Sequence, residues 1–532
     1  MKRKDMVKRM NREHALQKLK SDPGKIWDVI IIGGGATGLG CAVDAAARGY
    51  ETLLVEQSDF AKGTTSRSTK LIHGGVRYLA QGDLSLVFEA LHERGLMMQN
   101  APHLVRNQQF IIPVYEWWEG PFYNVGMKFY DVMAGRMGLG PSEKISPEET
   151  MAAIPNLDRN GLLGGVIYYD GQFDDARLAV NLAQTAAENG ATVLNYLRAA
   201  GLTRDGSGLL DGVRLRDLES GEEFTARGRA IINAAGIFAG ELLGMAEQGA
   251  GSAVLLSRGV HIVLDHSFLQ GDAAIMIPRT TDGRVLFAVP WHGKVIVGTT
   301  DVETEEPLLE PRASAEEIEF ILKNCEAYLN KDPRPADILS VFAGLRPLAV
   351  TTDRNVPTKD VTRKHQIAIS PSGLITITGG KWTIYRKMAE DAIDKAALVG
   401  GLPEKPCVTK NLPVHGYLRN MDFDAPLSYY GSDRVVLEET VLAEDPALAD
   451  PIHPAFPYIK AEVVWAVRHE MARTVEDFLA RRVRALFLDA RASIGMAPAV
   501  AQIMARELER DGAWASGQVE AYAELAKGYI VE

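Results

Sequence analysis

The chain is poor in cysteine and has fewer basic than acidic side chains. Its 532 residues include three cysteines, Cys41, Cys325 and Cys407, and no Cys-x-x-Cys pair. This distribution argues against a zinc site or a disulfide framework, so we expect no metal, and it fits a reducing cytoplasm. The chain has 58 Lys and Arg residues and 69 Asp and Glu residues, so its formal net charge is −11. A nucleic-acid-binding protein is not expected, since neutralising phosphates requires a basic face.

The sequence also lacks a long apolar run and a secretory signal. Its longest apolar run, residues 29–43, is glycine-rich and too short to cross a bilayer. Residues 1–25 form a basic extension without the apolar core of a signal peptide. A basic amphipathic helix here could dock on the protein or anchor on anionic lipid, and we favour docking. We therefore expect a protein that is soluble or bound to a membrane surface.

Strand and helix patterns alternate from residue 27 onward. An apolar run at 28–32 precedes a glycine-rich turn, an alanine-rich helix that stops at Gly49, and a second strand that ends at Glu56. This order is a βαβ unit and predicts a doubly wound α/β core. Cys41 falls inside the helix and is expected to be a small core residue.

The turn at residues 33–38 has the pattern Gly-x-Gly-x-x-Gly between a strand and a helix. Such a turn brings backbone N–H groups and a helix N-terminus close to a pyrophosphate. Glu56 ends the next strand, where a carboxylate binds the ribose of a dinucleotide. The residues that this motif predicts to bind a cofactor are Gly33, Gly35, Ala36, Thr37, Gly38 and Glu56.

Two later segments favour FAD over a nicotinamide cofactor. Residues 231–236 and 374–381 are strands that end in small residues and glycine turns. One cofactor touched by three dispersed strand ends suits the longer FAD, whereas an NAD enzyme would confine binding to one contiguous domain.

Other patterns predict the remaining architecture. Residues 254–300 are rich in β-branched side chains, with turns at 281–283 and 292–293, which is typical of an antiparallel sheet. Residues 458–530 have an almost entirely helical pattern. Asp174 and Asp175 begin a predicted helix that runs to about residue 189, and we attribute both carboxylates to helix capping rather than catalysis.

These patterns predict an α/β FAD-binding Rossmann-like core, an interleaved α+β substrate domain with an antiparallel sheet, and an all-helical C-terminal domain. The N-terminal extension is 1–25. The FAD-binding domain comprises 26–105, 160–245 and 345–400. The substrate-binding domain comprises 106–159 and 246–344. A proline-containing linker and the helical domain occupy 401–532.

An aromatic stretch lies at residues 113–140. Its side chains include Trp117, Trp118, Phe122, Tyr123, Phe129 and Tyr130, with Lys128 and Arg136 between them. Two interpretations are open: a lipid interface or quinone entrance, or a packed wall of the substrate domain.

Several longer motifs resemble the FAD-dependent glycerol-3-phosphate dehydrogenases. They are STKLIHGGVRYL at 68–79, FDDARL at 173–178, VGTTD at 297–301, GLRPL at 344–348 and GGKWTIYR at 379–386. The resemblance covers residues 26–400, and the helical C-terminal part matches the family in kind. It implies oxidation of sn-glycerol 3-phosphate to dihydroxyacetone phosphate by hydride transfer to FAD. It also implies electron transfer to a membrane quinone, a peripheral location on the cytoplasmic membrane, and a homodimer.

The resemblance further implies roles for individual residues. Arg346, supported by Arg363, is expected to bind the phosphate, since arginine forks suit a phosphate monoester. His261 is the first choice of proton acceptor, although it could instead be a core histidine. Arg77, Tyr78 and Lys381 are expected near the reacting oxygen and the flavin. The further cofactor-binding residues that the resemblance implies are Ser68, Lys70, Leu71, His73, Gly74, Ala235, Gly236, Gly380, Lys381 and Thr383.

Alternatives remain at this point. His73 is expected to be structural or adjacent to FAD rather than a base, and Asp301 is expected to order its loop. A glycerol-3-phosphate oxidase that uses oxygen, or an amine or hydroxy-acid oxidase on the same scaffold, would share the cofactor motif. A flavin-binding regulator without turnover is an alternative from another class.

Overall fold

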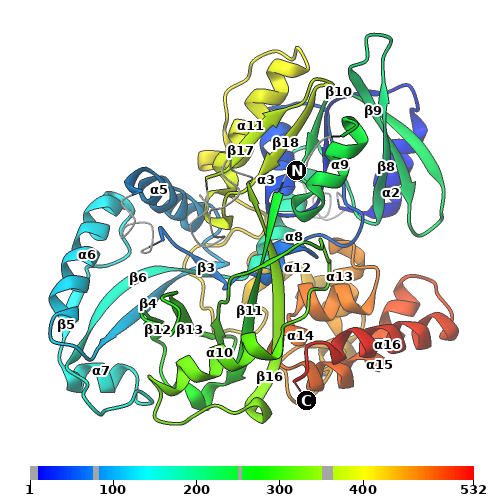
Figure 1. The fold of residues 1–532 in the computed structure, drawn as a ribbon. Helices are drawn as coiled ribbons and strands as arrows, with labels where there is room; N and C mark the ends of the chain where they lie inside the picture. The colour runs from blue at the N-terminus through cyan, green and yellow to red at the C-terminus, as the bar shows by residue number, and fades with distance from the viewer. Residues whose placement is uncertain (1–9, 76–82, 250–253, 350–363, 532) are drawn as a thin grey trace.

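The computed structural model describes residues 10–75, 83–249, 254–349 and 364–531. Two large sheets and a C-terminal group of helices make up these residues (Figure 1). The fold is the predicted one: a Rossmann-like α/β core, a second unit built on a mostly antiparallel sheet, and a helical C-terminal part.

The first sheet contains the predicted βαβ unit. Its strand order is β17 (Gln366–Ile369), β18 (Leu374–Thr378), β10 (Glu223–Asn233), β1 (Ile26–Ile32), β2 (Thr52–Val55) and β7 (Thr192–Leu194). The strands from β18 to β7 run parallel, and β17 is an antiparallel edge. A meander of β8 (Leu197–Arg204) and β9 (Leu210–Asp217) extends antiparallel from β10. The carboxyl ends of β1, β10 and β18 therefore meet at one edge, where a doubly wound sheet binds its ligand.

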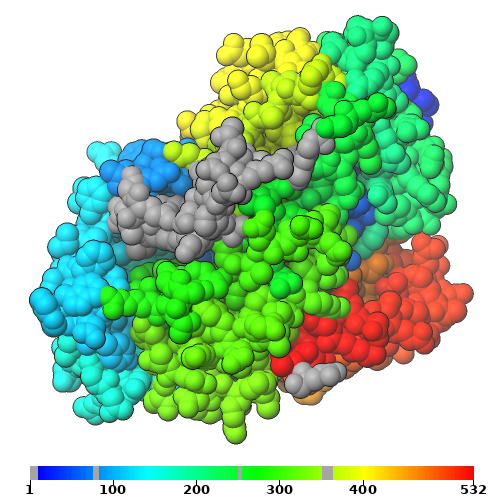
Figure 2. Space-filling model, viewed as in Figure 1, coloured from blue at the N-terminus to red at the C-terminus, as the bar shows by residue number. Residues whose placement is uncertain are grey.

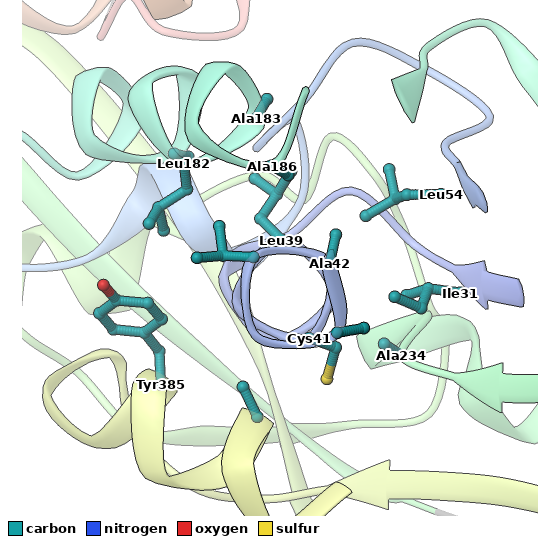
Figure 3. Close-up of a cluster of buried hydrophobic side chains, with 14 of the residues drawn as sticks. Ile31, Leu39, Cys41, Ala42, Leu54, Leu182, Ala183, Ala186, Ala234 and Tyr385 are labelled. Carbon is teal, nitrogen blue, oxygen red and sulfur yellow. The ribbon is translucent and has the colours of Figure 1, made fainter. Parts of the chain in front are cut away.

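Helix α3 (Ala36–Ala47) packs at the centre of this unit, between α8 (Asp175–Glu188) and α11 (Tyr385–Val399) (Figure 3). Its small side chains allow this close approach: a Cβ built on Gly40 would lie 2.9 Å from the Tyr385 ring. Cys41 is completely buried among apolar side chains such as Ile31 and Ala234. The prediction that Cys41 is a core residue is confirmed.

The second sheet contains ten strands. They are β15 (Val302–Thr304), β11 (Val254–Asp265), β14 (Lys294–Gly298), β13 (Leu286–Trp291), β12 (Ala274–Ile277), β4 (Val105–Val114), β6 (Gly164–Phe173) and β3 (Leu71–Ile72) in order, with β16 (Ile338–Ala349) on β11 and β5 (Glu143–Ile145) on β6. The pairings are antiparallel except for β4 with β12. Those two strands come from separate segments of the chain, so no hairpin fixes their relative direction. The turn between β13 and β14 falls at His292 and Gly293, as predicted, and both residues have the positive φ of a tight hairpin.

Strand pairing links segments on both sides of two predicted domain boundaries. Strand β6 lies within the predicted FAD-binding segment 160–245 and pairs with β4 along the second sheet. Strand β16 runs through the predicted boundary at residue 345 and pairs with β11 over its whole length. In both cases a strand of the second sheet leads directly toward the first sheet. The sequence therefore has no loop-like composition within these strands that would mark a domain boundary there. Asp174, the residue after β6, already caps α8 on the first sheet.

The remaining helices of the first 350 residues pack against strands of the two sheets or against neighbouring helices. They are α2 (Arg12–Ser21), α5 (Leu84–Asn100), α6 (Glu119–Ala134), α7 (Pro147–Ala153), α9 (Ala239–Ala246) and α10 (Ala315–Glu326). Helix α2 is docked: Arg12 is buried with its Nη2 atom 2.6 Å from Asp217 Oδ1, and Leu19 is buried too. The favoured interpretation of the N-terminal extension is confirmed for this helix.

The C-terminal part is helical, as predicted. It contains α12 (Asp433–Leu437), α13 (Lys460–Glu470), α14 (Ala485–Leu488), α15 (Ala490–Glu507), α16 (Gly512–Lys527) and two π-helical segments, η10 (Glu438–Leu442) and η12 (Asp477–Arg482). Its core packs directly on the second sheet, where Phe478 and Phe487 share an apolar cluster with Val263 and Phe342. Among the residues that the structure describes, none of the helices is long and apolar enough to cross a membrane.

Candidate active site

A cavity of about 1300 Å³ opens at the carboxyl ends of β1, β10 and β18 and continues to the second sheet and helix α6. Pockets for small ligands usually measure about 300–1000 Å³. The larger volume suits a dinucleotide together with a small substrate. Its two ends have different chemistry, with glycine turns at one and a histidine, an arginine and a lysine at the other.

The glycine turn forms the first end of the cavity. Gly33 has a φ of +119°, and a Cβ built there would lie 2.4 Å from the carbonyl oxygen of Ala234. At Gly38 a built Cβ would overlap the carbonyl oxygen of Gly33. Larger residues at these positions would push the helix away from the strands. Gly33, Gly35, Ala36 and Thr37 line the cavity, while Gly38 lies behind them and allows the close packing.

Glu56 also lines the cavity and is tied to the turn. Its Oε2 accepts a hydrogen bond from Gly34 N at 2.6 Å, and its Oε1 accepts one from Ser58 N at 2.7 Å. Burial raises the pKa of Glu56, and these two N–H groups oppose that rise. Each carboxylate oxygen keeps a second lone pair, so the group can also accept from a ribose hydroxyl.

Most of the other proposed cofactor residues lie around the same cavity. Those that line it are Ser68, Leu71, His73, Ala235, Gly236, Gly380, Lys381 and Thr383. Gly236 has a positive φ, and no atom lies within 4 Å of a Cβ built there, so it borders open space. Three strand ends from separate parts of the chain thus meet at one cavity.

Besides Gly38, two of the proposed cofactor residues do not line the cavity. Lys70 is fully buried, and its Nζ lies 2.6 Å from Asp175 Oδ2 and 2.6 Å from the Ser66 carbonyl oxygen. Burial lowers the pKa of Lys70 to about 7. Gly74 donates its N–H to Tyr130 Oη at 2.7 Å and has no room for a Cβ. These contacts are between neighbouring segments of the protein, so the structure gives both residues packing roles.

The two aspartates at the start of α8 have different roles. Asp174 accepts from Arg177 N and caps the helix, as predicted. Asp175 instead binds Lys70, the Ser68 hydroxyl at 2.6 Å, and Arg484 at 3.1 Å. The capping explanation is therefore confirmed for Asp174. Asp175 accepts from Ala176 N in the first turn of the helix at 2.8 Å as well, so its local role is only part of its bonding. Its partners Lys70, Ser68 and Arg484 are far away in sequence, and no local pattern signals them.

His261 lies at the second end of the cavity, on β11. Its ring stacks on Phe342 with centroids 4.8 Å apart, and its Nε2 lies 2.9 Å from Thr69 Oγ1. Burial lowers the pKa of His261 well below its usual value, and the positive charges of Lys70 and Arg346 act in the same direction. The imidazole is therefore held in its neutral form.

Arg346 lies on β16 beside β11, and strand register places it on the same side as His261. It is opposite Ser257, while Phe342 is opposite His261, and the intervening pair is Gly259 with Gly344. The Arg346 guanidinium donates to Ser257 Oγ at 3.3 Å, Thr299 Oγ1 at 3.0 Å and Thr300 O at 3.1 Å. These partners fix the direction of the fork while it borders the cavity.

Lys381 and His73 lie close enough to interact electrostatically. Burial lowers the pKa of His73 to about 3, and the positive charges of Lys381 and Arg94 contribute. His73 is thus neutral at the cavity wall, and its place next to a flavin stays a prediction. Asp301 accepts from Ser257 Oγ and lies 3.9 Å from Arg346 Nη1, so it connects its loop to the two strands that carry these residues.

Three proposed site residues, Arg77, Tyr78 and Arg363, lie outside the described residues. The structure brings the other proposed substrate residues, His261, Arg346 and Lys381, to one cavity. Sequence reasoning missed Thr69, the hydrogen-bonding partner of His261, although it lies inside the motif at 68–79. It also missed Gly259 and Gly298. A Cβ at these positions would overlap the side chains of Arg346 and His261, respectively, and only the fold shows which side chains lie there.

These residues fit FAD. The cradle at Gly33 and Gly38 excludes side chains, and the exposed N-terminus of α3 suits a pyrophosphate. Glu56 suits a ribose, and Ala235, Gly236, Gly380 and Thr383 offer small contacts along the cavity. The cofactor and the substrate residues can therefore share one space.

Comparison with known proteins agrees with this geometry. Residues 28–386 match the family model described as FAD dependent oxidoreductase, and residues 375–514 match the C-terminal domain of alpha-glycerophosphate oxidase. The chain therefore belongs to the FAD-dependent oxidoreductases, and FAD is its cofactor.

Similar proteins define the group more narrowly. The chain is 40% identical to a mitochondrial glycerol-3-phosphate dehydrogenase of Arabidopsis thaliana, over 92% of this chain and 84% of that protein. It is 38% identical to the mitochondrial enzyme of Mus musculus, over 94% and 72%. A crystal structure of glycerol-3-phosphate dehydrogenase from Bacillus halodurans, complexed with FAD, superposes with a TM-score of 0.79 at 29% identity and 98% coverage of both chains. Within its family, the chain belongs with the FAD-dependent glycerol-3-phosphate dehydrogenases.

Proposed function

We propose that the protein oxidises sn-glycerol 3-phosphate to dihydroxyacetone phosphate and passes the electrons to a membrane quinone. The observation that carries the proposal is the single cavity in which a dinucleotide cradle meets Arg346, Lys381 and a neutral His261. A phosphate needs cations, and an alcohol that loses a hydride needs a group to take its proton. The relatives with these names support the same substrate.

Arg346 binds the phosphate in this proposal. Its guanidinium borders the cavity, and a planar fork of N–H donors suits the oxygens of a phosphate. Because the fork is already fixed by its neighbours, binding orders few further side-chain rotamers. Arg363, Arg77 and Tyr78 lie outside the described residues and stay substrate-site candidates from the resemblance alone.

His261 takes the hydroxyl proton. Its ring and the hydroxyl-bearing Thr69 both line the cavity, and its Nε2 lies 2.9 Å from Thr69 Oγ1. As the proton leaves the substrate hydroxyl, the C–H bond of the same carbon breaks and its electron pair leaves as hydride. FAD supplies the hydride acceptor when it is bound. The positive charge of Lys381 stabilises the negative charge that develops beside it.

Helix α6 supports a membrane-bound electron acceptor. One of its faces packs inside, where Met127 and Tyr130 are buried. The opposite face, and Trp117 two residues before the helix, expose apolar side chains: Trp117 at 80%, Phe122 at 61%, Val125 at 70%, Phe129 at 46% and Val132 at 76%. The packed-wall interpretation describes the buried face, and we assign the lipid-interface interpretation to the exposed one. Figure 2 shows α6, in cyan, at the left edge of the molecule.

The exposed face of α6 adjoins the cavity, since Phe122 and Val125 line it as well. Exposed apolar patches of this kind are typical of membrane or partner contacts. We propose that α6 lies in the surface of the cytoplasmic membrane and that a quinone reaches the cavity beside it. The homodimer that the resemblance implies stays a prediction.

Steady-state turnover tests the substrate and the acceptor together. Purified enzyme is given sn-glycerol 3-phosphate with a water-soluble quinone, or with oxygen and a peroxide assay. We expect dihydroxyacetone phosphate and quinol in equal amounts, and little peroxide. Peroxide as the main product would show that the protein is an oxidase and not a quinone-linked dehydrogenase. Turnover of amino acids in place of sn-glycerol 3-phosphate would show that the proposed substrate is wrong.

Vesicle flotation tests the role of α6. We expect the protein to float with vesicles of phosphatidylethanolamine and phosphatidylglycerol. The double variant Val125→Glu/Val132→Glu should bind at least about tenfold more weakly, because each buried valine is worth roughly 1.5 kcal/mol or more. Leu398→Glu is the matched control, since Leu398 is 74% exposed on another helix. Equal flotation of all three proteins would contradict the assignment.

A further inference from the structure

The segment 58–68, here called the cofactor loop, forms one wall of the dinucleotide end of the cavity. Seven of its residues line the cavity: Ala61, Lys62, Gly63, Thr64, Thr65, Arg67 and Ser68. Its only regular structure is the short 3₁₀ helix η1 (Thr64–Arg67). The loop therefore has few backbone hydrogen bonds of its own to hold this shape, a property of segments with low local stability.

The loop touches the glycine turn and the start of helix α3 directly. Ala61 N donates to the carbonyl oxygen of Gly34 at 3.0 Å, and Thr65 Oγ1 accepts from Ala36 N at 2.9 Å. Trp382 Nε1 also donates to the Thr65 carbonyl oxygen at 2.9 Å. A displaced loop would therefore alter both the turn and the helix end that receive a pyrophosphate.

Asp59 connects the loop to the C-terminal helices. It is fully buried, and it accepts from Arg481 Nε at 2.6 Å and from both terminal nitrogens of Arg482 at 2.9 and 3.0 Å. Against the effect of burial, Arg482 and Arg481 hold the pKa of Asp59 below its usual value. Both arginines end the π-helical segment η12, so one carboxylate links the loop to two adjacent side chains of the C-terminal part.

Two further contacts reach the loop from the same C-terminal segment. Lys62 Nζ lies 2.8 Å from Glu476 Oε2, and Glu476 Oε1 also accepts from Arg481 at 2.7 Å. Arg484, itself buried, donates to the Ser66 carbonyl oxygen at 2.9 Å. Charged side chains between residues 476 and 484 thus hold the loop at its start, middle and end.

We propose that the C-terminal helical part holds the cofactor loop in the conformation that binds FAD, through Asp59, Glu476, Arg481 and Arg482. None of these four residues lines the cavity, so they are positioning residues and do not touch the cofactor. Removing one charge from a buried, hydrogen-bonded ion pair leaves its partner uncompensated and destabilises the surrounding structure. Here the structure that loses support is the wall of the FAD site.

The test is the rate at which FAD leaves the purified holoenzyme, followed by the rise of free-flavin fluorescence after dilution. Asp59→Asn keeps the side-chain shape and removes the charge. Asp217→Asn is the matched control, because Asp217 is also a buried aspartate paired with an arginine, Arg12, but lies on β9 away from the cavity. We expect both variants to melt at a lower temperature. Only Asp59→Asn should release FAD faster, by at least about tenfold. A tenfold change in rate corresponds to a free energy smaller than the destabilisation that usually follows when a buried ion pair is broken.

Two additional variants separate positioning from loss of folding. Glu476→Gln weakens the same connection from the C-terminal side and should also speed FAD release, even if Asp59→Asn does not accumulate as folded protein. Arg482→Lys keeps a positive charge beside Asp59 and should release FAD more slowly than Arg482→Met. FAD release at the wild-type rate in Glu476→Gln, or an equal acceleration in Asp217→Asn, would overturn the proposal.

Discussion

Replacing Gly259 by alanine should weaken substrate binding, because the added methyl group would displace the neighbouring side chain of Arg346. A Cβ built on Gly259 would lie 2.2 Å from Arg346 Nη2, 2.6 Å from Cζ and 2.7 Å from Nη1. Non-bonded heavy atoms rest at about 3.5–4.0 Å. The guanidinium therefore has to retreat by about 1 Å or more. Gly259 does not have a positive φ, so the backbone accepts alanine and the main effect is on the position of Arg346.

The size of this effect follows from what Arg346 is proposed to do. A displacement of about 1 Å in a substrate-positioning group can cost roughly 100-fold in rate. Loss of one charge-assisted hydrogen bond costs about 1.5–3 kcal/mol, and each 1.36 kcal/mol is a factor of ten. We therefore expect kcat/KM for sn-glycerol 3-phosphate to fall about 10- to 100-fold, mostly through a higher KM.

Steady-state kinetics with an artificial electron acceptor measures this effect, and the FAD content shows whether the cofactor site is intact. Gly244→Ala is the control, since no atom lies within 4 Å of a Cβ built at that position on α9. Arg346→Lys should resemble Gly259→Ala, because lysine keeps the charge but loses the fork. If Gly259→Ala binds FAD fully and has a KM within about twofold of the wild type, the assignment of the phosphate to Arg346 is refuted.

Two other predictions concern histidines. His261→Asn should slow flavin reduction by about 100-fold or more, the usual contribution of a general base, with FAD still bound; anaerobic stopped-flow absorbance measures this, and a near-normal rate would remove His261 as proton acceptor. His415 lies between Glu188 Oε1 at 2.7 Å and Asp433 Oδ2 at 2.6 Å, and although burial opposes it, these carboxylates raise the pKa of His415 to about 10. Because this pKa is raised on folding, its stabilisation is complete below about pH 6.5 and is lost as the pH rises through 10. Urea unfolding should therefore show His415→Asn to be less stable than the wild type by about 2–4 kcal/mol at pH 6 and by much less at pH 10, whereas an equal loss at both pH values would rule out the charged pair.

The sequence predicts the cofactor end of the site because the signal there is local. Strand, glycine turn and helix follow one another within residues 26–47, and the steric reasons for Gly33 and Gly38 act inside this unit. The same holds for the helix cap at Asp174 and the hairpin turn at His292, which are set by neighbouring residues. Local chemistry of this kind can be recognised without the tertiary structure.

The substrate end depends on strand register, which the sequence does not state. His261 and Arg346 could be named only from motifs, and their shared orientation comes from the pairing of β11 with β16. Lys70 shows the opposite case: it lies in a cofactor-like motif, but its partner Asp175 is 105 residues away. The link between Asp59 and Arg482 spans 423 residues. No sequence pattern identifies ion pairs between residues this far apart. The residues that hold the site in place could therefore be recognised only from the three-dimensional structure.

The most direct test of the whole account is the anaerobic absorbance of the purified yellow protein on addition of sn-glycerol 3-phosphate. We expect rapid bleaching of the flavin band with this substrate and none with unphosphorylated glycerol, because the cations of the cavity bind the phosphate. An unbleached flavin with FAD fully bound, or equal bleaching by glycerol, would contradict the proposed reaction.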